Sequence, residues 1–219
     1  MLFMHNILIF LIIIFMVEDL QYIDLERYQG LIFDMDGTLL DTMPAHLQAW
    51  SQTAQHFKFP FSHQWLHSLG GMPSFKIVAE INKQHHLGLD PQLVANFKMA
   101  VFSEIESYGE VIPCTHDVVK HFYGHKKMAV GTGSQRQSAI KLLTKSGLLD
   151  KFDAIVTASD VKNHKPNPDT FLQAASLLGL QANQCVVFED TDLGKQAAHS
   201  GGMDCVMVEN GRLVFYPYL

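Results

Sequence analysis

The sequence predicts an α/β fold, in which a doubly wound parallel sheet forms the core and a helical unit is inserted after the first strand. Three observations lead to this prediction. Short apolar runs alternate with helix-type segments through the second half of the chain, which is typical of parallel strands joined by helices. Residues 43–112 have helical spacing and no strand pattern. A chain of 219 residues, 47% of them hydrophobic, is long enough for one domain with such an insertion.

The first strand is the apolar run Leu31–Phe33, whose short length and continuous hydrophobicity indicate full burial. The pattern then changes to helix, because Pro44 suits a first helical turn and Ser62, Ser74 and Asp90 are candidate caps. The inserted helices are expected at 44–57, around Trp65 and Leu66, at 74–86 and at 90–108. The expected division is therefore an apolar extension at 1–17, a core at 28–42 and 113–219, and a helical cap at 43–112.

The second half of the chain alternates between strands and helices. Strands are expected at 127–130, 154–157, 185–188 and 205–208, and helices at 135–146, 168–178 and 191–200. Asn210-Gly211 favours a two-residue hairpin turn, since both residue types tolerate positive φ. A final strand at Leu213-Val214 is therefore expected to pair antiparallel with the last parallel strand.

The composition excludes some classes of protein. A formal net charge of −6 argues against general nucleic-acid binding. Cys114, Cys185 and Cys205 are an odd set with no C-x-x-C spacing, which favours reduced core thiols in a cytosolic protein. We therefore expect a cytoplasmic monomer with no nucleic-acid partner and no stable membrane association.

The apolar run from Ile7 to Val17 is the unusual segment, and it is shorter than the roughly 20 residues of a membrane span. It has the length of a signal-peptide core, but no Lys or Arg precedes Arg27 and no small-residue cleavage pattern follows. The open interpretations are a weak membrane anchor, an atypical signal and upstream sequence added by a wrong start assignment. We favour the third, since Met16 would begin a conventional protein shortly before the first strand.

Two carboxylates, Asp34 and Asp36, follow the first strand directly, and Gly37 ends it. Open parallel sheets bind ligands at the carboxyl ends of their strands, so this position suits a site. Alternation places both side chains on the same side if the chain stays extended, and two close like charges are unfavourable without a cation between them. The pair therefore suggests an oxygen-ligand metal site, most simply Mg²⁺, with a plain strand-ending turn as the competing interpretation.

Polar side chains also follow other predicted strands. Thr132 and Ser134 stand in a glycine-containing turn before a helix, where hydroxyl and N–H groups suit an anion. Lys165 precedes the next helix, and Glu189-Asp190 follow the strand at 185–188. One edge of the sheet thus gathers four carboxylates, two hydroxyls and a lysine, which is costly to desolvate. A phosphate–Mg²⁺ site explains this concentration, because acids hold the metal while the lysine and hydroxyls hold phosphoryl oxygens.

These residues lie in four segments that resemble, in order, the four motifs of the haloacid-dehalogenase-like hydrolase superfamily. The segments are Asp34-Met-Asp-Gly-Thr-Leu39, Thr132-Gly-Ser134, Lys165-Pro-Asn-Pro168 and Glu189-Asp-Thr-Asp-Leu-Gly194. They spread over residues 30–208, and the inserted helices resemble the cap of the β-phosphoglucomutase-like branch. Within that branch, the strand segments are most similar to small sugar-phosphate phosphatases of the fructose-1-phosphatase type. The resemblance implies a Rossmann-like core and Mg²⁺-dependent chemistry on a small phosphorylated metabolite.

The resemblance also implies a role for each matching residue. Asp34 would be the nucleophile that forms an aspartyl-phosphate, and Asp36 the general acid and then the base for water. Thr132 and Lys165 would complete the catalytic set by binding the transferring phosphoryl group, and Lys165 would also offset the charge of Asp34. His46 matches the position at which the cap-bearing sugar-phosphate mutases carry a functional histidine. The implied metal ligands are Asp34, the Asp36 main-chain carbonyl, Asp190, and Glu189 directly or through water. The candidate substrate-binding residues are His46, Lys98, Thr132, Gly133, Ser134 and Lys165.

The function implied is hydrolysis of a small sugar phosphate similar to fructose 1-phosphate, and two alternatives stay open. A β-phosphoglucomutase-type mutase is the first, because both reactions share Asp34 and Asp36. A mutase needs a cap cation for its second phosphate, and the position of the expected arginine is Ser74 here, although Lys98 is another cap cation. A non-catalytic phosphate-binding module on the same fold is the second alternative. Thr42 is expected only to close the first loop or to cap a helix.

Overall fold

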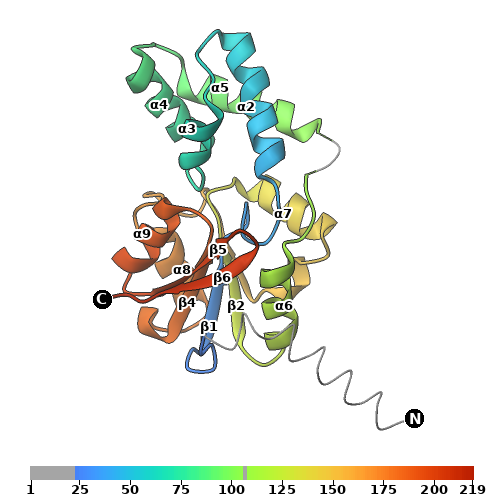
Figure 1. The fold of residues 1–219 in the computed structure, drawn as a ribbon, viewed down its shortest axis with the longest axis vertical. Helices are drawn as coiled ribbons and strands as arrows, with labels where there is room; N and C mark the ends of the chain where they lie inside the picture. Colours follow the sequence, from blue (N-terminus) through green and yellow to red (C-terminus); the bar gives the residue numbers. More distant parts are fainter. Residues whose placement is uncertain (1–22, 106–107) are drawn as a thin grey trace, which may run out of the picture.

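The computed structural model describes residues 23–105 and 108–219, and its centre is a six-stranded sheet (Figure 1). The strands are β1 (Gly30–Phe33), β2 (Lys127–Gly131), β3 (Ala154–Val156), β4 (Cys185–Glu189), β5 (Asp204–Glu209) and β6 (Arg212–Tyr216). Their order is β3-β2-β1-β4-β5-β6, with β6 antiparallel to β5 and all other neighbours parallel. The predicted fold class, a doubly wound parallel sheet, is confirmed.

Helices cover both faces of this sheet. They are α6 (Pro113–Phe122), α7 (Arg136–Lys145), α8 (Asp169–Leu177) and α9 (Asp192–Ser200), with short 3₁₀ turns η1 (Leu149–Lys151) and η2 (Ala182–Gln184). Side chains alternate along β1, so that Leu31 and Phe33 join the hydrophobic cluster with α6 and α7, while Ile32 joins the cluster with α8 and α9. Burial on both faces leaves the carboxyl ends of the strands as the place for polar groups.

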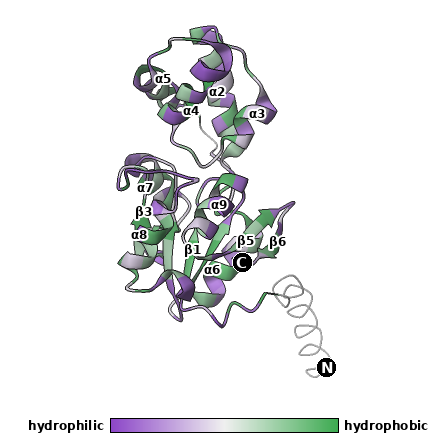
Figure 2. Ribbon diagram, turned by 90° about the vertical axis from the view of Figure 1, so that its left-hand side faces the viewer, coloured by the Kyte–Doolittle hydropathy of each residue, from purple (hydrophilic) through white to green (hydrophobic). Residues whose placement is uncertain are grey.

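A separate group of helices lies beyond the carboxyl ends of the strands (Figure 1, Figure 2). Its members are α2 (Met43–Phe57), α3 (His63–Ser68), α4 (Ser74–His85) and α5 (Pro91–Ser103). They enclose a hydrophobic cluster of their own, in which Trp50, Leu66, Ile81 and Val94 are at most 3% exposed. We refer to α2–α5 as the helical unit, and to the carboxyl ends of β1, β2 and β4 with the loops around them, including the loop that carries Lys165, as the sheet edge.

Two connections join the helical unit to the sheet, and they run side by side. The Asp41 N–H donates to the Glu110 carbonyl at 2.9 Å, and the Ile112 N–H donates to the Leu39 carbonyl at 2.9 Å. Gly109 has a φ of +101°, and a Cβ there would lie 1.7 Å from the main-chain oxygen of Asp41. Because only glycine combines this conformation with so close a backbone approach, Gly109 fixes the crossing of the two connections.

The structure corrects two predicted helix boundaries and adds one helix that was not predicted. α5 ends at Ser103 and not near Tyr108, because the chain turns back and the Tyr108 hydroxyl donates to the Ser103 carbonyl at 2.8 Å. Ser74 is the first residue of α4 and not its cap, since Pro73 occupies the cap position. The sequence analysis also assigned no helix to the stretch after Pro113, where α6 begins with this proline in its first turn.

Other expectations are confirmed or lie outside the structure. The hairpin between β5 and β6 is present, with φ of 51° at Asn210 and 76° at Gly211. Cys185 and Cys205 are fully buried in the core. The apolar extension at 1–17 lies outside the described residues. Among the helices that the structure describes, none is long and apolar enough to cross a bilayer.

Candidate active site

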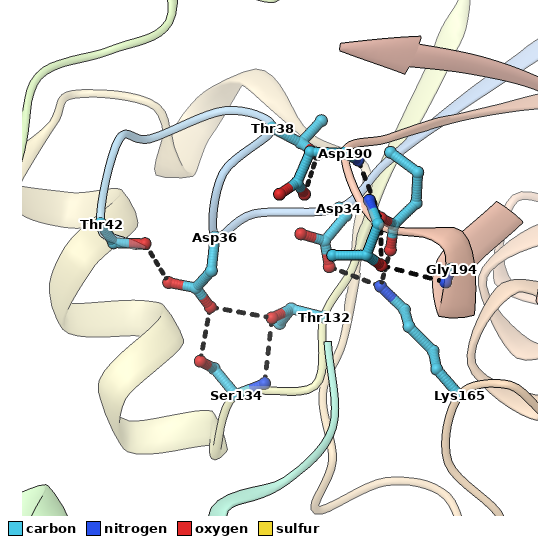
Figure 3. Close-up of polar contacts among 11 residues, drawn as sticks. Asp34, Asp36, Thr38, Thr42, Thr132, Ser134, Lys165, Asp190 and Gly194 are labelled. Carbon is cyan, nitrogen blue, oxygen red and sulfur yellow. Dashed lines mark hydrogen bonds and ion pairs between the residues drawn. The ribbon is translucent and has the colours of Figure 1, made fainter. Parts of the chain in front are cut away.

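Asp34 follows β1 and pairs with a buried lysine. Lys165 Nζ lies 2.5 Å from Asp34 Oδ1 and 2.5 Å from Glu189 Oε1 (Figure 3). All three residues are at most 2% exposed. Burial lowers the pKa of Lys165, but the two carboxylates outweigh it and raise the pKa above its ordinary value. Lys165 is therefore a permanent positive charge beside Asp34.

Glu189 is held by the first turn of α9. Its Oε2 accepts hydrogen bonds from the N–H groups of Asp190 and Thr191 at 2.8 Å each and from the Thr191 hydroxyl at 2.9 Å. The Thr191 hydroxyl also caps α9 by accepting from the Gly194 N–H at 3.0 Å. A Cβ on Gly194 would lie 1.9 Å from the Glu189 carboxyl, so glycine is required there. Both oxygens of Glu189 are engaged, one with Lys165 and one with this turn.

Asp190 is positioned by the turn that follows β1. The Thr38 hydroxyl donates to Asp190 Oδ1 at 3.0 Å. Gly37 has a φ of +93°, and a Cβ there would lie 2.2 Å from Asp190 Oδ2. The glycine of the Asp-Met-Asp-Gly segment therefore serves both the sharp turn and the close approach of this carboxylate.

Asp34, Glu189 and Asp190 each place one carboxylate oxygen within 4.8 Å of the others. Burial raises the pKa of Asp34 against the opposing charge of Lys165, and the neighbouring carboxylates raise it further. Burial, followed by the Glu189 charge, raises the pKa of Asp190 to about 8. A divalent cation relieves such crowding, and these hard oxygen donors match Mg²⁺. The set fits the expected ion, and the side chain of Asp36 is not part of it.

Asp36 has a separate set of partners on the other side of the loop (Figure 3). It accepts from the hydroxyls of Ser134 at 2.6 Å, Thr42 at 2.7 Å and Thr132 at 3.4 Å, and contacts His46 Nε2 at 3.2 Å. Burial alone raises the pKa of Asp36, but the hydrogen bonds and charge of these partners outweigh it and hold the pKa well below its usual range. Two carboxylates two residues apart thus have different partners: Asp34 lies beside a lysine and two other acids, and Asp36 lies beside three hydroxyls and a histidine.

A buried chain of contacts connects Asp36 to the helical unit. Lys98 Nζ lies 2.6 Å from His46 Nδ1, and the His46 ring stacks on Phe102 with centroids 4.2 Å apart. Lys98 is 2% exposed, and burial lowers its pKa to about 7 against the weaker attraction of Asp36. Burial and the Lys98 charge lower the pKa of His46 as well. The chain Lys98–His46–Asp36 therefore links a labile ammonium to the acid–base candidate.

A cavity of about 430 Å³ lies between the helical unit and the sheet edge. Its sheet side includes Asp34, Asp36 and Thr132, and its helical side includes His46 and Lys98. Much of the remaining wall is apolar and comes from Leu47, Trp50, Leu66, Met72, Phe75 and Ile77. This size and lining suit one small ligand with a single strongly polar end.

The structure brings all of the predicted site residues to this one region. Those that line the cavity are Asp34, Asp36, His46, Lys98, Thr132, Gly133 and Ser134. Lys165, Glu189 and Asp190 gather around Asp34 just outside the lining. The expectation that Asp34 and Asp36 share one side of an extended strand is not met, because β1 ends at Phe33 and the two carboxylates have different partners.

Sequence reasoning missed several hydroxyl donors and one histidine. The Thr42 side chain makes no helix-capping bond and closes the loop after β1 by donating to Asp36, a partner that the sequence did not indicate. Thr38 and Thr191 each donate to a carboxylate of the acid cluster, and their places inside acid-rich motifs were an available signal. His164, which lines the cavity next to Lys165, carried no comparable signal in the sequence.

Comparison with known proteins identifies the family of this chain. Residues 31–208 match the model of the haloacid dehalogenase-like hydrolase family. The chain is 48% identical over 184 residues to the fructose-1-phosphate phosphatase YqaB of Escherichia coli, covering 84% of this chain and 97% of that protein. It is 27% identical to a beta-phosphoglucomutase of Bacillus subtilis, covering 84% of each. A beta-phosphoglucomutase structure from Clostridium difficile superposes with a TM-score of 0.75 at 27% identity, covering 84% of this chain and 85% of that one. This chain belongs to the haloacid dehalogenase-like hydrolase family.

Proposed function

We propose that this protein is a Mg²⁺-dependent phosphatase that hydrolyses a small sugar phosphate, such as fructose 1-phosphate, through an aspartyl-phosphate. The observation that carries the proposal is the pair Asp34 and Asp36, which line one small cavity with different partners: Asp34 has Lys165, and Asp36 has His46 and three hydroxyls. The 48% identity to a fructose-1-phosphate phosphatase supports the choice of ester. A sugar phosphate matches a cavity of about 430 Å³ with one charged end.

In the first step, an Asp34 oxygen attacks phosphorus and the bond to the leaving oxygen breaks. Lys165, 2.5 Å from Asp34, offsets the charge that the carboxylate and the phosphoryl group bring together. The Thr132 hydroxyl and the main chain at Gly133 line the same side of the cavity and bind phosphoryl oxygens. Asp34, Asp190 and the Asp36 carbonyl would hold Mg²⁺, which supplies positive charge against the phosphoryl oxygens when bound.

Asp36 moves the protons of both steps. Its four hydrogen-bond partners favour the carboxylate, which is the form needed to take a proton from the attacking water in the second step. In the first step it must hold a proton for the leaving oxygen. The Lys98–His46 contact provides a path, in which Lys98 gives a proton to His46 Nδ1 and His46 gives the proton on Nε2 to Asp36. The proton taken from water then returns along the same path.

Hydrolysis is favoured over transfer between two sugar positions. A mutase must hold a second phosphate at the far end of its substrate, and this requires a cation there. Lys98 is the lone Lys or Arg among the described residues that line the cavity, and it is buried against His46. Since the described lining holds no second lysine or arginine, the aspartyl-phosphate loses its phosphate to water.

The test measures phosphate release by the purified protein from a panel of small phosphate esters, with Mg²⁺ and with EDTA. We expect fast Mg²⁺-dependent release from compact sugar phosphates. A separate reaction supplies β-glucose 1-phosphate with a trace of glucose 1,6-bisphosphate and follows glucose 6-phosphate and free phosphate. Dominant glucose 6-phosphate would establish the mutase instead. Saturable binding of phosphate esters with no turnover would establish a non-catalytic binding module.

We also propose a division into a core at 28–42 and 113–219 and a helical cap at 43–112, in a cytoplasmic monomer. The distinct hydrophobic cluster of the helical unit supports the division. The first described residues, Ile23 and Leu25, already pack into the core, so the apolar run at 1–17 is not needed for catalysis. A shortened chain that starts at Met16 should keep full activity, and light scattering of it reports the mass in solution.

A further inference from the structure

His164 has a buried nitrogen that the rest of the structure leaves unpaired. Among the described residues, its Nδ1 is the one buried side-chain nitrogen or oxygen without a hydrogen-bond partner. The residue is 6% exposed, and it lines the cavity next to Lys165 in the chain. Buried polar atoms nearly always have a partner in native structures, and leaving one unpaired is costly. A group that enters the cavity can therefore supply the partner of this nitrogen.

The groups around His164 do not supply that partner. The Phe75 ring of α4 meets the imidazole edge-on, with centroids 5.8 Å apart and planes at 84°. Val161 and Ala158, which line the same part of the cavity, are apolar. Lys76, the Asn163 main chain and Asp169 act on the imidazole, in that order, but none of them meets Nδ1 at hydrogen-bonding geometry.

The chemistry of the ring narrows the choice of partner. Burial, and then the Lys76 charge, lower the pKa of His164, so the imidazole is neutral at neutral pH. A neutral imidazole presents Nδ1 either as a donor or as an acceptor, depending on its tautomer. A hydroxyl satisfies both cases, because it donates and accepts. A phosphoryl oxygen only accepts, and the phosphoryl group already has Lys165 and Thr132 as partners in the proposed function.

We propose that His164 is a specificity residue, whose Nδ1 forms a hydrogen bond with a hydroxyl of the sugar moiety while the phosphoryl group sits on Asp34. This inference rests on the proposed function and assigns one side chain to the organic part of the ester. The Phe75 ring of α4 packs against the imidazole of His164. The helical unit therefore encloses the hydrogen bond between His164 and the sugar hydroxyl. Esters without hydroxyls leave Nδ1 unpaired and are held less tightly.

The experiment compares fructose 1-phosphate with propyl phosphate, which has the ester but no hydroxyl. In His164→Phe, which keeps an aromatic ring of similar size against Phe75, kcat/KM for fructose 1-phosphate should fall about tenfold, the loss expected for one hydrogen bond. The value for propyl phosphate should stay within about twofold. His164→Asn should recover most of the difference, because its amide places a donor and an acceptor near Nδ1. His116→Phe, in half-buried surroundings on α6, is the matched control and should change neither ester.

Dissociation constants for the same two esters, measured by calorimetry with the inactive Asp34→Asn protein with and without His164→Phe, give a readout independent of turnover. A preference for fructose 1-phosphate that disappears with His164→Phe upholds the inference, even if the wild type releases no phosphate and the proposed function fails. An equal loss for both esters means that His164 acts through Lys165 or through packing, and it overturns the inference. An unchanged preference overturns it as well, while leaving the phosphatase proposal intact.

Discussion

The two walls of the cavity each bury one lysine, and the two ammonium groups have opposite environments. At the sheet edge, Lys165 lies between Asp34 and Glu189, which raise its pKa. In the helical unit, Lys98 has a histidine as its nearest partner, and burial lowers its pKa to about 7. One charge is therefore permanent and the other is labile. In the proposed function, the sheet edge would provide fixed electrostatics for the phosphoryl group, and the helical unit would provide protons.

The largest expected effect is the loss of the nucleophile at the sheet edge. Asp34→Asn keeps the volume of the side chain but removes the attacking oxygen, so kcat should fall by on the order of 10⁴ or more. Circular dichroism should show an intact fold, because one member of a crowded acid set is neutralised. The exposed Asp41→Asn is the matched control and should retain full activity. Ordinary activity in Asp34→Asn would exclude an aspartyl-phosphate at this position.

Removing the permanent charge of Lys165 should have the next largest effect, because it lowers the free energy of unfolding and also alters the site. Lys165→Met leaves Asp34 and Glu189 buried without their counter-ion, and we expect a loss of about 3–5 kcal/mol in the free energy of unfolding. Urea denaturation of the metal-free protein measures it. Lys162→Met, at an exposed position in the same loop, should be neutral. If Lys165→Met were as stable as the wild type, the two carboxylates would not need this lysine.

The acid cluster offers a test that does not involve either lysine. Asp190→Asn removes a carboxylate whose pKa is raised to about 8 by burial and by Glu189, so the metal-free protein should melt at a higher temperature at pH 8. The same change removes a proposed metal ligand, so added Mg²⁺ should no longer raise the melting temperature. Thermal unfolding with and without Mg²⁺ measures both effects. An Mg²⁺ shift equal to that of the wild type would exclude Asp190 as a ligand.

Removing the labile charge of Lys98 should have the smallest effect on the free energy of unfolding. The change should be a gain in stability, opposite to the loss expected for Lys165→Met. Lys98→Met replaces a buried, poorly compensated ammonium with an apolar side chain, and we expect a gain of about 1 kcal/mol or more in the free energy of unfolding. Turnover should fall by about 10–100-fold, because the proton path to Asp36 is cut. Urea denaturation and phosphate release measure the two quantities. Loss of stability in Lys98→Met would mean that the Lys98–His46 contact is a net stabilising one.

The pH dependence of this stability difference follows from the Lys98 pKa. The folded value is about 7 and the ordinary value is 10.5, so between these pH values the unfolded chain binds the proton that the folded chain does not. The wild type therefore gains stability relative to Lys98→Met as pH rises above 7, by at most about 1.4 kcal/mol per pH unit. The advantage of Lys98→Met is largest and constant below pH 7. Paired urea titrations at pH 6, 7, 8 and 9 check the sign.

The sequence was enough to predict the strands and the charged residues of the site, but not every helix or every polar contact. The strands are short, continuous apolar runs, and the acids and Lys165 lie at their ends, so local pattern was enough to place them. α6 was not predicted, although its buried residues Val118, Val119 and Phe122 have the spacing of one helix face. Thr42 and His164 were missed as well. Thr42 donates to Asp36 because the loop after β1 turns back on itself, and the burial of His164 depends on Phe75, which is far from it in the chain.

The crossing of the two connections at Gly109 and Asp41 has a consequence for how such a protein changes through evolution. The inserted segment leaves and rejoins the core at points that are hydrogen-bonded to each other. The insertion is therefore equivalent to a loop whose two ends are held together. The entropic cost of closing such a loop rises only slowly as the inserted segment becomes longer. Segments of different length can therefore be inserted at this point while the sheet and its edge keep their arrangement.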